Sequence, residues 1–459
     1  MILLHTNDIH GRITGLTRIA TLIEQTRLEH PNETVLYFDT GDSEDLTERM
    51  SNLSKGASMH RLLSAMGCDA VVVGNASLQR FGPEILAEHA AAASYPMLLA
   101  NVRQPHGAPF AGTQPTTLLE ADGHYLGLIG ITSPVDGSYE SFYDLTVSPL
   151  LPTILDMSAA LRQDGAEAII LLSHMGLEAD RELAATLQGV VDLIIGGHSH
   201  SLLPQGEQFG SITIAQAGSF AEHLGRIDLS WRNDRLVVEQ VSTLQITNTI
   251  PQSATLLKRI EELEHEIEQF LDIIVGDLAE PLDFALDREC GVGNLLADML
   301  RSYMNADVGI AAVGQAFVGP LEDGPLTRLA LWKACPSIAT PGVTMMTGEM
   351  LRTMVERGLD AVVGQTPSRL LRGQAPGLLH LSGASWVNGQ LLVAGRPADP
   401  KRRYRVAASD WEFEAHGGYI DPEWQLQPQY VTSTILREAL EEYLARHWPV
   451  RVRHGRVIS

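Results

Sequence analysis

The sequence predicts an α/β protein in which a large layered domain is followed by a smaller mixed domain. Strand-like and helix-like segments alternate from residue 1 to about residue 245, and strands separated by helices are typical of a layered α/β domain. Residues 209–246 lack helical segments, so we expect them to form β-hairpins that close this domain. A length of 459 residues exceeds what one ordinary core holds, which favours two domains.

The strands and helices of the first domain follow from hydrophobic periodicity. One helix is expected over 16–28, where Leu16, Ile19 and Ile23 share a face, and another over 83–93, which opens at a proline. Short apolar, β-branched runs predict strands at 2–6, 34–38, 70–74, 97–100, 125–131, 167–172, 191–195 and 212–216.

A long amphipathic segment over 254–274 is predicted to be a helix that links the two domains. It could instead bind a partner, although a linker helix packed between domains is the simpler interpretation. The predicted boundaries are 1–250 for the first domain, 251–275 for the linker and 276–459 for the second domain. The second domain is expected to contain helices at 290–306 and 347–358 with a strand at 308–313.

Composition excludes several functions. The net charge of −23 argues against a nucleic-acid polymer or an anionic membrane surface as partner. No apolar stretch is long enough to span a bilayer, and Met1 leads directly into the first strand without a leader. Three widely spaced cysteines (Cys68, Cys290 and Cys335) suit reduced thiols. We therefore expect a cytoplasmic protein. The sequence leaves its oligomeric state open.

Seven potential metal ligands occur in five short stretches: HTNDIHG, FDTGD, VVVGN, LLSHMG and IIGGHSH. Each of the last four follows an apolar, β-branched run, so each ligand should lie just past the end of a strand. Open α/β sheets place their sites in the loops beyond the carboxyl ends of the strands. The predicted ligands are Asp8, His10, Asp42, Asn75, His174, His198 and His200.

The residue types suit a pair of ions. Asp8 and His10 are two residues apart at a strand end, so alternation should point both side chains the same way. Asp42 follows Gly41 in a tight turn, where a carboxylate can bridge two ions, and Asn75 offers a neutral carbonyl oxygen.

His198 and His200 repeat the two-residue spacing of the first pair. Taken alone, a histidine such as His174 is usually a core or loop residue, and His5 is interpreted as structural. The coincidence of seven ligands behind strands nevertheless favours a metal centre. The mixed nitrogen and oxygen set suits Mn, Zn, Fe or Co without choosing among them.

The charge of such a centre selects its substrate. Two divalent ions and two carboxylates leave roughly +2, which attracts a phosphate or phosphate ester despite the acidic surface. Two ions about 3.5–4 Å apart can generate a hydroxide and clamp the attacking and leaving oxygens. A purely structural metal site would instead show closed coordination.

The five stretches, in this order, resemble the calcineurin-type metallophosphoesterases, specifically the two-domain 5'-nucleotidase and cyclic phosphodiesterase family. GNLLADMLRSYMNADVGIA (293–311) and TGEMLRTMVERG (347–358) are similar to that family's C-terminal domain. The resemblance implies a four-layer αββα catalytic domain and a 5'-nucleotidase-like substrate domain. It implies one ion held by Asp8, His10, Asp42 and His200, and a second held by Asp42, Asn75, His174 and His198, with Asp42 bridging.

The third motif departs from the family. The family reads Gly-Asn-His-Glu-Phe-Asp there, and its His and Asp form a dyad that stabilises the transition state or leaving group. This chain has Ala76 at the His position, and Gln79 (or Arg80, with one residue inserted) at the Asp position. Arg80 could supply a fixed positive charge to a substrate, or it could be a solvated surface arginine.

The second domain departs as well. Val318 stands where the family has a substrate-binding arginine, and the last glycine-rich motif is reduced to HGGY (416–419). Trp411, Phe413 and Tyr419 could stack a nucleotide base, or they could be alternating core aromatics of a strand. The residues therefore do not support specificity for AMP.

These observations predict a metal-dependent phosphoesterase that hydrolyses a phosphorylated small molecule, with a nucleotide as one candidate. A bridging hydroxide would attack phosphorus in line, with Asp42 and Asn75 as catalytic residues. General acid catalysis contributes about 10²–10⁴-fold, so loss of the dyad predicts slow hydrolysis that favours good leaving groups. The alternative is a pseudoenzyme that binds a phosphorylated ligand or partner without significant turnover.

Overall fold

The computed structural model describes residues 1–360, 362, 364, 375–414 and 417–458. The chain forms two compact units, Met1–Ile267 and Glu268–Ser459, and the division falls inside the predicted linker. His416 of the reduced C-terminal motif lies outside the described residues. Among the described residues, no helix combines the length and apolarity needed to cross a bilayer.

Two β-sheets form the centre of the first unit. One has seven strands in the order β15-β14-β1-β2-β3-β4-β6, and the other has six in the order β12-β13-β11-β10-β8-β7. The first sheet comprises β1 Ile2–Thr6, β2 Val35–Asp39, β3 Ala70–Val72, β4 Met97–Leu98, β6 Thr113–Gln114, β14 His223–Arg232 and β15 Arg235–Gln245. The second comprises β7 Thr116–Ala121, β8 His124–Thr132, β10 Ala168–His174, β11 Leu193–Gly196, β12 Glu207–Phe209 and β13 Ile212–Ala215.

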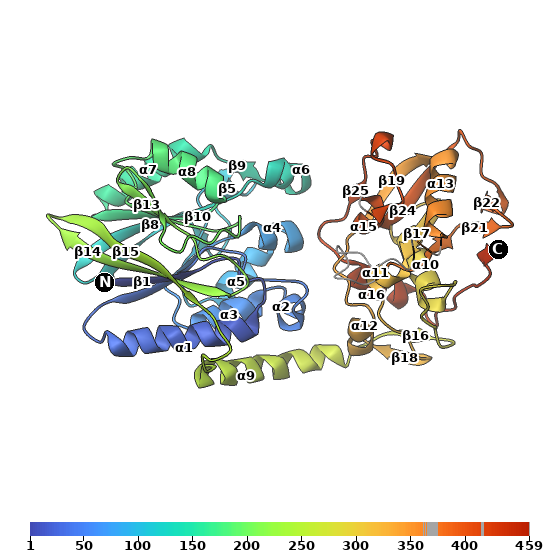
Figure 1. The fold of residues 1–459 in the computed structure, drawn as a ribbon, viewed down its shortest axis with the longest axis horizontal. Coiled ribbons are helices and arrows are strands. Elements are labelled where there is room, and N and C mark those ends of the chain that lie inside the picture. The colour runs from blue at the N-terminus through green and yellow to red at the C-terminus, as the bar shows by residue number, and fades with distance from the viewer. Residues whose placement is uncertain (361, 363, 365–374, 415–416, 459) are drawn as a thin grey trace. The chain divides into compact units, whose positions relative to one another are not determined.

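The two sheets pack face to face and carry helices on their outer faces (Figure 1). Leu3 and Phe38 of the first sheet share a buried cluster with Leu128 and Leu172 of the second. The helices are α1 Ile13–Glu29, α2 Arg49–Leu53, α3 Ala57–Ala65, α4 Asn75–Phe81, α5 Ile85–Ala92, α6 Ser138–Tyr143, α7 Leu150–Gln163 and α8 Leu177–Thr186. This arrangement confirms the predicted four-layer αββα domain.

Parallel pairing sets the position of the functional loops. β1, β2 and β3 run parallel in adjacent places in one sheet, as do β10 and β11 in the other. Their carboxyl ends therefore lie at one edge of each sheet, and the loops that follow them meet at a common rim. The antiparallel hairpin β14–β15 pairs with the free edge of β1, which confirms the hairpins expected near residue 245.

The predicted linker segment forms α9, Ala254–Leu271. Ser253 caps it, because its hydroxyl accepts the backbone N–H of Leu256, and the same hydroxyl donates to Glu24 of α1. Leu256 and Leu263 are buried on the inner face, whereas Leu257 is 41% exposed. The first turns of α9 are thus anchored to the first unit.

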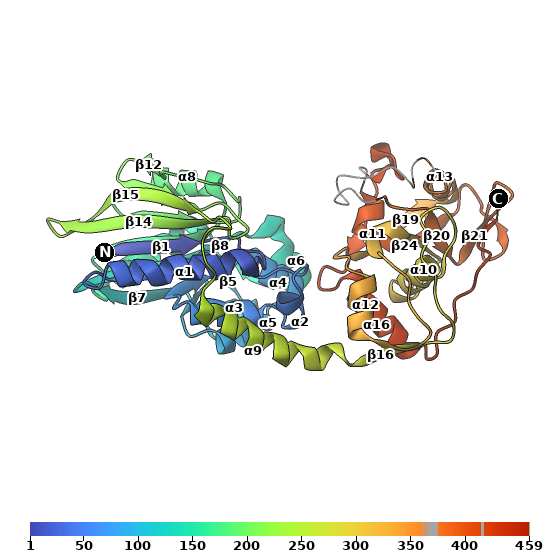
Figure 2. The same cartoon turned by 60° about the horizontal axis from the view of Figure 1, so that its bottom comes forward.

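The second unit is built on the five-stranded sheet β20-β17-β24-β19-β25 (Figure 2). Its strands are β16 Ile274–Leu278, β17 Val308–Ala312, β18 Gly324–Thr327, β19 Pro341–Thr347, β20 Leu379–Ser382, β21 Ala384–Val387, β22 Gln390–Val393, β23 Arg396–Pro397, β24 Arg403–Ser409, β25 Gln429–Tyr430 and β26 Val457–Ile458. Its helices are α10 Gly291–Tyr303, α11 Val313–Ala316, α12 Arg328–Ala334, α13 Gly348–Gly358, α15 Asp410–Phe413 and α16 Leu436–Arg446.

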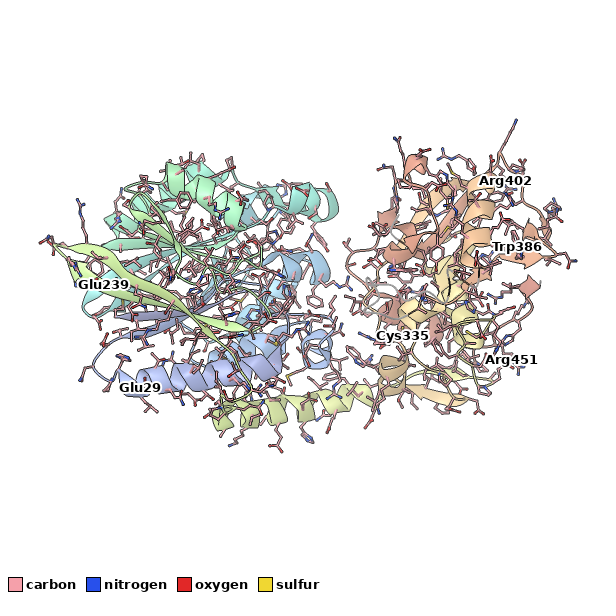
Figure 3. The ribbon with its side chains drawn as sticks, viewed as in Figure 1. Glu29, Glu239, Cys335, Trp386, Arg402 and Arg451 are labelled. Carbon is pink, nitrogen blue, oxygen red and sulfur yellow. The ribbon has the colours of Figure 1, made fainter. Side chains whose placement is uncertain are left out.

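Apolar cores lie on both faces of this sheet. α10 and α16 pack on one face through Leu296 and Leu440, and α13 packs on the other through Leu351. Cys335, labelled in Figure 3, is fully buried at the end of α12. The predicted mixed α/β character of this domain is therefore confirmed.

Candidate metal centre

All seven predicted ligands lie at the rim, five of them in loops, one at the start of a helix and one at the end of a strand. Asp8 and His10 follow β1, Asp42 follows β2, and Asn75 opens α4 after β3. His174 is the last residue of β10, and His198 and His200 follow β11. The structure gathers six of them into two groups of potential ligand atoms, each group lying within 4.8 Å.

The first group consists of Asp8, His10 and His200. The Nε2 atoms of the two histidines are 3.2 Å apart, and Asp8 Oδ1 lies 3.9 Å from His10 Nε2 and 3.5 Å from His200 Nε2. The other oxygen, Oδ2, accepts hydrogen bonds from Asn7 Nδ2 and His198 N. Asp8 Oδ1 is buried and accepts no hydrogen bond from the described residues. It is thus held with one bare oxygen directed at two imidazoles.

The second group is Asp42, His174 and His198, with Asn75 beside it. His174 Nδ1 lies 2.6 Å from the carbonyl of Thr40, which can only accept, so Nδ1 carries a proton. Nε2 then faces Asp42 Oδ2 at 3.2 Å and Asn75 Oδ1 at 3.1 Å. With His174 neutral, three acceptor atoms converge there without a hydrogen between them, which is the donor set that a cation requires.

The pKa shifts of His174 and Asp42 also indicate that this group gains from a positive charge between its members. Burial raises the pKa of the Asp42 carboxyl, but the charge and hydrogen bond of His174 outweigh burial and hold that pKa below its usual range. Burial lowers the pKa of His174, while Asp42 raises it to about 9. Without a metal ion, a proton on Nε2 neutralises this group, and a divalent ion must displace that proton.

The two groups are joined through the backbone. The N–H of His198 donates to Asp8 of the first group, while its ring belongs to the second. The N–H of Asp8 donates to the carbonyl of Gly41, and the N–H of His10 donates to the carbonyl of Asp42. Two cation positions would therefore be neighbours on one scaffold.

The backbone at the rim corrects one prediction. β1 ends at Thr6, and Asp8 and His10 have left-handed backbones with φ of 49° and 45°. The directions of the Asp8 and His10 side chains are therefore not set by strand alternation, although the two side chains do converge. Asp42, His198 and His200 also have positive φ. Such conformations cost roughly 1–3 kcal/mol each and cluster at functional sites.

Close packing at the Asp42 turn requires glycine. A Cβ on Gly74 would lie 2.0 Å from Asp42 Oδ1. Gly41 has φ of 95°, and a Cβ there would lie 2.8 Å from His174 Nδ1. These two glycines let the loops after β2 and β3 approach closely enough for Asp42, Asn75 and His174 to meet.

The altered third motif forms the start of α4. The N–H of Ala76 donates to Asp42 Oδ1 at 2.9 Å, so the motif still supports the carboxylate through its backbone. Asn75 Nδ2 donates to Gln79 Oε1 at 2.9 Å, which turns Asn75 Oδ1 towards His174. Arg80 lies four residues after Ala76, and residues four apart share a helix face. Arg80 belongs to neither ligand group.

The aromatic residues proposed for stacking are mostly core residues. Phe413 and Tyr419 are 4% and 0% exposed and belong to a buried cluster of the second unit, so neither offers a face to a base. β24 ends at Ser409, and Trp411 and Phe413 lie in the short helix α15, so the expected strand alternation is also wrong here. Trp411 is half-buried and packs edge-on against Tyr419.

The second unit contains an apolar pocket of about 260 Å³. It is lined by Phe284, Leu286, Gly314, Phe317, Val318 and Ala375. Val318, which takes the place of the family arginine, is 46% exposed. The lining thus provides apolar contact without a cationic side chain.

Sequence reasoning missed the residues that support the ligands. Asn7 bonds Asp8 through its amide N–H and accepts the N–H of Ala217. Thr40 orients His174 through its carbonyl, and Gln79 orients Asn75. Asn7 lies within the HTNDIHG stretch. The side-chain types of Thr40 and Gln79, by contrast, give no sign in the sequence that these residues orient metal ligands.

Two known families match the chain. Residues 1–202 match the calcineurin-like phosphoesterase family, and residues 274–422 match the 5'-nucleotidase C-terminal domain. Together they span both structural units.

The chain is also similar to individual proteins of known sequence. The chain is 26% identical over 429 residues to the uncharacterized metallophosphoesterase YunD of Bacillus subtilis, covering 91% of this chain and 90% of YunD. It is 25% identical over 339 residues to a 5'-nucleotidase of Diplobatis ommata, covering 65% of this chain and 58% of that protein.

Solved structures show the same fold. The NAD nucleotidase NadN of Haemophilus influenzae superposes with a TM-score of 0.66 at 16% identity, covering 100% of this chain and 99% of that one. A putative 5'-nucleotidase of Staphylococcus aureus gives a TM-score of 0.63 at 18% identity with the same coverage. At this identity, the likeness establishes the fold alone.

Proposed function

Because the chain belongs to the two-domain family that joins a calcineurin-like phosphoesterase to a 5'-nucleotidase C-terminal domain, we propose that it is a metal-dependent phosphoesterase with a dinuclear centre. Its substrate would be a phosphorylated small molecule. The ligands would be Asp8, His10, Asp42, Asn75, His174, His198 and His200.

One observation supports this proposal above the others. His174 Nε2 faces Asp42 Oδ2 at 3.2 Å and Asn75 Oδ1 at 3.1 Å, while the proton of the neutral ring is held on Nδ1 by the Thr40 carbonyl. The bare Asp8 Oδ1 repeats the pattern in the first group. Clusters of acceptors suit cations, so the residues fit two divalent ions of the Mn, Zn, Fe or Co type.

The side chains have distinct parts in the reaction. Bound divalent ions would supply positive charge that polarises a phosphoryl oxygen and lowers the pKa of water. Asp42 would hold both positions together, since one oxygen is fixed by the N–H of Ala76 and the other faces His174. Asn75 would orient the phosphoryl group through the ion that its Oδ1 holds, because Gln79 accepts a hydrogen bond from Nδ2 and so fixes the amide with Oδ1 inward.

The missing imidazole defines the substrate range. Ala76 cannot protonate a departing oxygen, and that contribution is typically worth about 10²–10⁴-fold. Whole enzymatic accelerations amount to about 8–23 kcal/mol, so most of the stabilisation would survive. Aryl esters and phosphoanhydrides, whose leaving groups need no proton, should therefore be the best substrates.

The proposed substrate class is a phosphorylated small molecule, with a nucleotide as one candidate. The cytoplasmic location expected from the sequence remains part of the proposal.

A second candidate function rests on the same Ala76. With the imidazole lost and the ligands kept, the chain could bind a phosphorylated ligand or partner without turnover. Only the rate distinguishes this pseudoenzyme from a slow enzyme.

The test compares metal content and hydrolysis in one preparation. The full chain is loaded with Mn²⁺, metal per chain is counted, and hydrolysis of an aryl phosphate and an aryl phosphodiester is measured beside Asp42→Asn. We expect at least two ions per chain and turnover well above that variant. Two or more ions with no turnover above Asp42→Asn would establish the pseudoenzyme, and fewer than two ions would contradict the dinuclear centre.

A further inference from the structure

A third group of potential ligands, which includes none of the seven rim ligands, lies inside the first unit. Glu44, His60 and His89 are 5%, 2% and 0% exposed, and their ligand atoms lie within 4.8 Å of one another. Glu44 lies in the loop after β2, two residues beyond Asp42, while His60 and His89 come from α3 and α5. Neither the rim ligands nor the proposed reaction uses any of these three side chains.

The tautomer of His89 leaves its inward nitrogen without a hydrogen. His89 Nε2 lies 2.6 Å from the backbone carbonyl of Lys55, which can only accept, so the proton of a neutral ring is on Nε2. Nδ1 points at Glu44 Oε1 from 3.6 Å and has no hydrogen-bond partner among the described residues. A buried lone pair facing a carboxylate oxygen is costly unless a cation lies between them.

His60 completes the set. Its Nε2 and Glu44 Oε1 are within hydrogen-bond distance at 2.7 Å, so a bound ion would replace the proton that these two atoms share. Its Nδ1 lies 2.9 Å from the Tyr95 hydroxyl. Histidines that bind metals usually carry a second-shell oxygen partner on the ring nitrogen that faces away from the ion. Both histidines have one here, a hydroxyl for His60 and a backbone carbonyl for His89.

From this geometry, we propose that Glu44, His60 and His89 form a separate buried site for a divalent transition-metal ion. One carboxylate and two imidazoles suit Zn²⁺, Co²⁺ or Mn²⁺, with bonds of about 2.0–2.2 Å for zinc. Gly56 closes over the site, since a Cβ there would lie 2.5 Å from Glu44 Cγ and 2.8 Å from His89 Nε2.

The ion would fasten three elements to one another. It would tie α3 and α5 to the loop that carries Asp42, whose backbone is left-handed with φ of 55°. The proposed role of this ion is to hold these elements together, and it stands independently of whether the rim catalyses hydrolysis.

The test counts zinc in full-length chains. Wild-type protein grown with Zn²⁺ should retain one ion more than His89→Gln, because glutamine keeps a donor for the Lys55 carbonyl but removes Nδ1. The matched control is His124→Gln, which removes a half-exposed histidine paired to Glu167 at 2.8 Å and should retain the wild-type count. Equal zinc in wild type and His89→Gln would overturn the proposal.

Crystals of the wild type provide a measurement that does not depend on a variant folding. An anomalous difference map at the zinc edge should show a peak between Glu44, His60 and His89, separate from peaks at the rim. Rim peaks without this one would overturn the site and leave the proposed function standing. A peak at Glu44, His60 and His89 without peaks at the rim would support this site and contradict the proposed dinuclear centre.

Discussion

Two buried histidines, one in each unit, have the same kind of partner at ring nitrogen Nδ1 and different partners at Nε2. His174 in the first unit and His380 in the second each use Nδ1 to donate to a backbone carbonyl, that of Thr40 or of Leu378. His380 Nε2 then accepts the N–H of Cys290 at 3.0 Å. His174 Nε2 instead faces the oxygens of Asp42 and Asn75.

The difference separates polar groups that satisfy one another from polar groups that need an ion. A buried acceptor opposite a donor is complete, as His380 is. A buried acceptor opposite other acceptors is stabilised only when a proton or a metal ion lies between them, as at His174 and at Asp8. Charged or polar side chains in a core therefore indicate a binding site only when they do not satisfy one another's hydrogen-bonding groups.

The largest effect should come from His174→Asn beside His380→Asn. Asparagine keeps a donor near the Nδ1 position and removes Nε2 in both cases. We expect His174→Asn to lose a metal ion and to lower kcat/KM on an aryl phosphate by about 10³-fold or more, since the bound ions supply several kcal/mol. His380→Asn should change kcat/KM less than about threefold. A similar loss in both variants would remove the distinction between the two histidines.

Ala76→His tests whether the absence of the family histidine is the sole reason that the reaction is slow. Restoring an imidazole at the start of α4 should raise kcat on an alkyl phosphate by about 10²–10⁴-fold, and much less on an aryl ester. Ala87→His, on the exposed side of α5, is the control. An equal gain on both substrates would show that the imidazole does not act on the leaving group.

Metal removal should act on the first unit. When the free metal concentration is near 1,000 times Kd, each bound ion stabilises the folded unit by about 4 kcal/mol. A chelator should therefore lower the melting temperature of the first unit. Five of the six tryptophans lie in the second unit, and tryptophan fluorescence should report an unchanged transition there. Calorimetry with and without chelator measures both. Equal shifts would contradict a metal centre confined to the first unit.

Acid should act on the second unit through His380. Burial lowers the pKa of this imidazole to about 4, below its usual value near 6.5, so the unfolded chain binds a proton that the folded chain excludes. Stability is therefore complete above about pH 6.5 and falls towards pH 4, by roughly 3 kcal/mol in total.

In His380→Asn that slope should flatten, and stability at pH 7.5 should drop by about 1–3 kcal/mol because the bond from Cys290 N is weakened or lost. Urea unfolding followed by tryptophan fluorescence measures both quantities. The exposed His454→Gln serves as control, and a slope that survives in His380→Asn would show that other groups cause it.

The smallest effect should come from Gln79→Leu. Removing the acceptor frees the Asn75 amide to rotate, and losses of second-shell partners usually cost about 10–100-fold in metal affinity or activity. Gln163→Leu, at the exposed end of α7, should be silent in the same titration of Mn²⁺ against hydrolysis. No change in Gln79→Leu would mean that Asn75 needs no support.

The sequence was informative where a local pattern decides the structure. Periodicity placed β1, α1, α9 and the ligand loops, because apolar spacing and strand ends are properties of short stretches. Parallel pairing within each sheet, together with the packing of the two sheets on one another, then brings Asp8, Asp42 and His174 to one rim.

What the sequence could not show depends on contacts between distant residues. Strand alternation was the wrong reason for the convergence of Asp8 and His10, whose left-handed backbones arise from loop packing. The pattern left both base stacking and core packing open for Phe413 and Tyr419, because a pattern does not reveal exposure, and the structure places both in a core. The grouping of Glu44 with His60 and His89 joins three elements, so their spacing carries no motif.

The central claim is that the rim holds two neighbouring cations in ligand sets built from mutually facing acceptors. An anomalous difference map from crystals soaked in Mn²⁺ tests it most directly. We predict two peaks about 3.5–4 Å apart, one beside Asp8, His10 and His200 and one beside Asn75, His174 and His198, with Asp42 between them. A single peak, or none at these residues, would contradict the account.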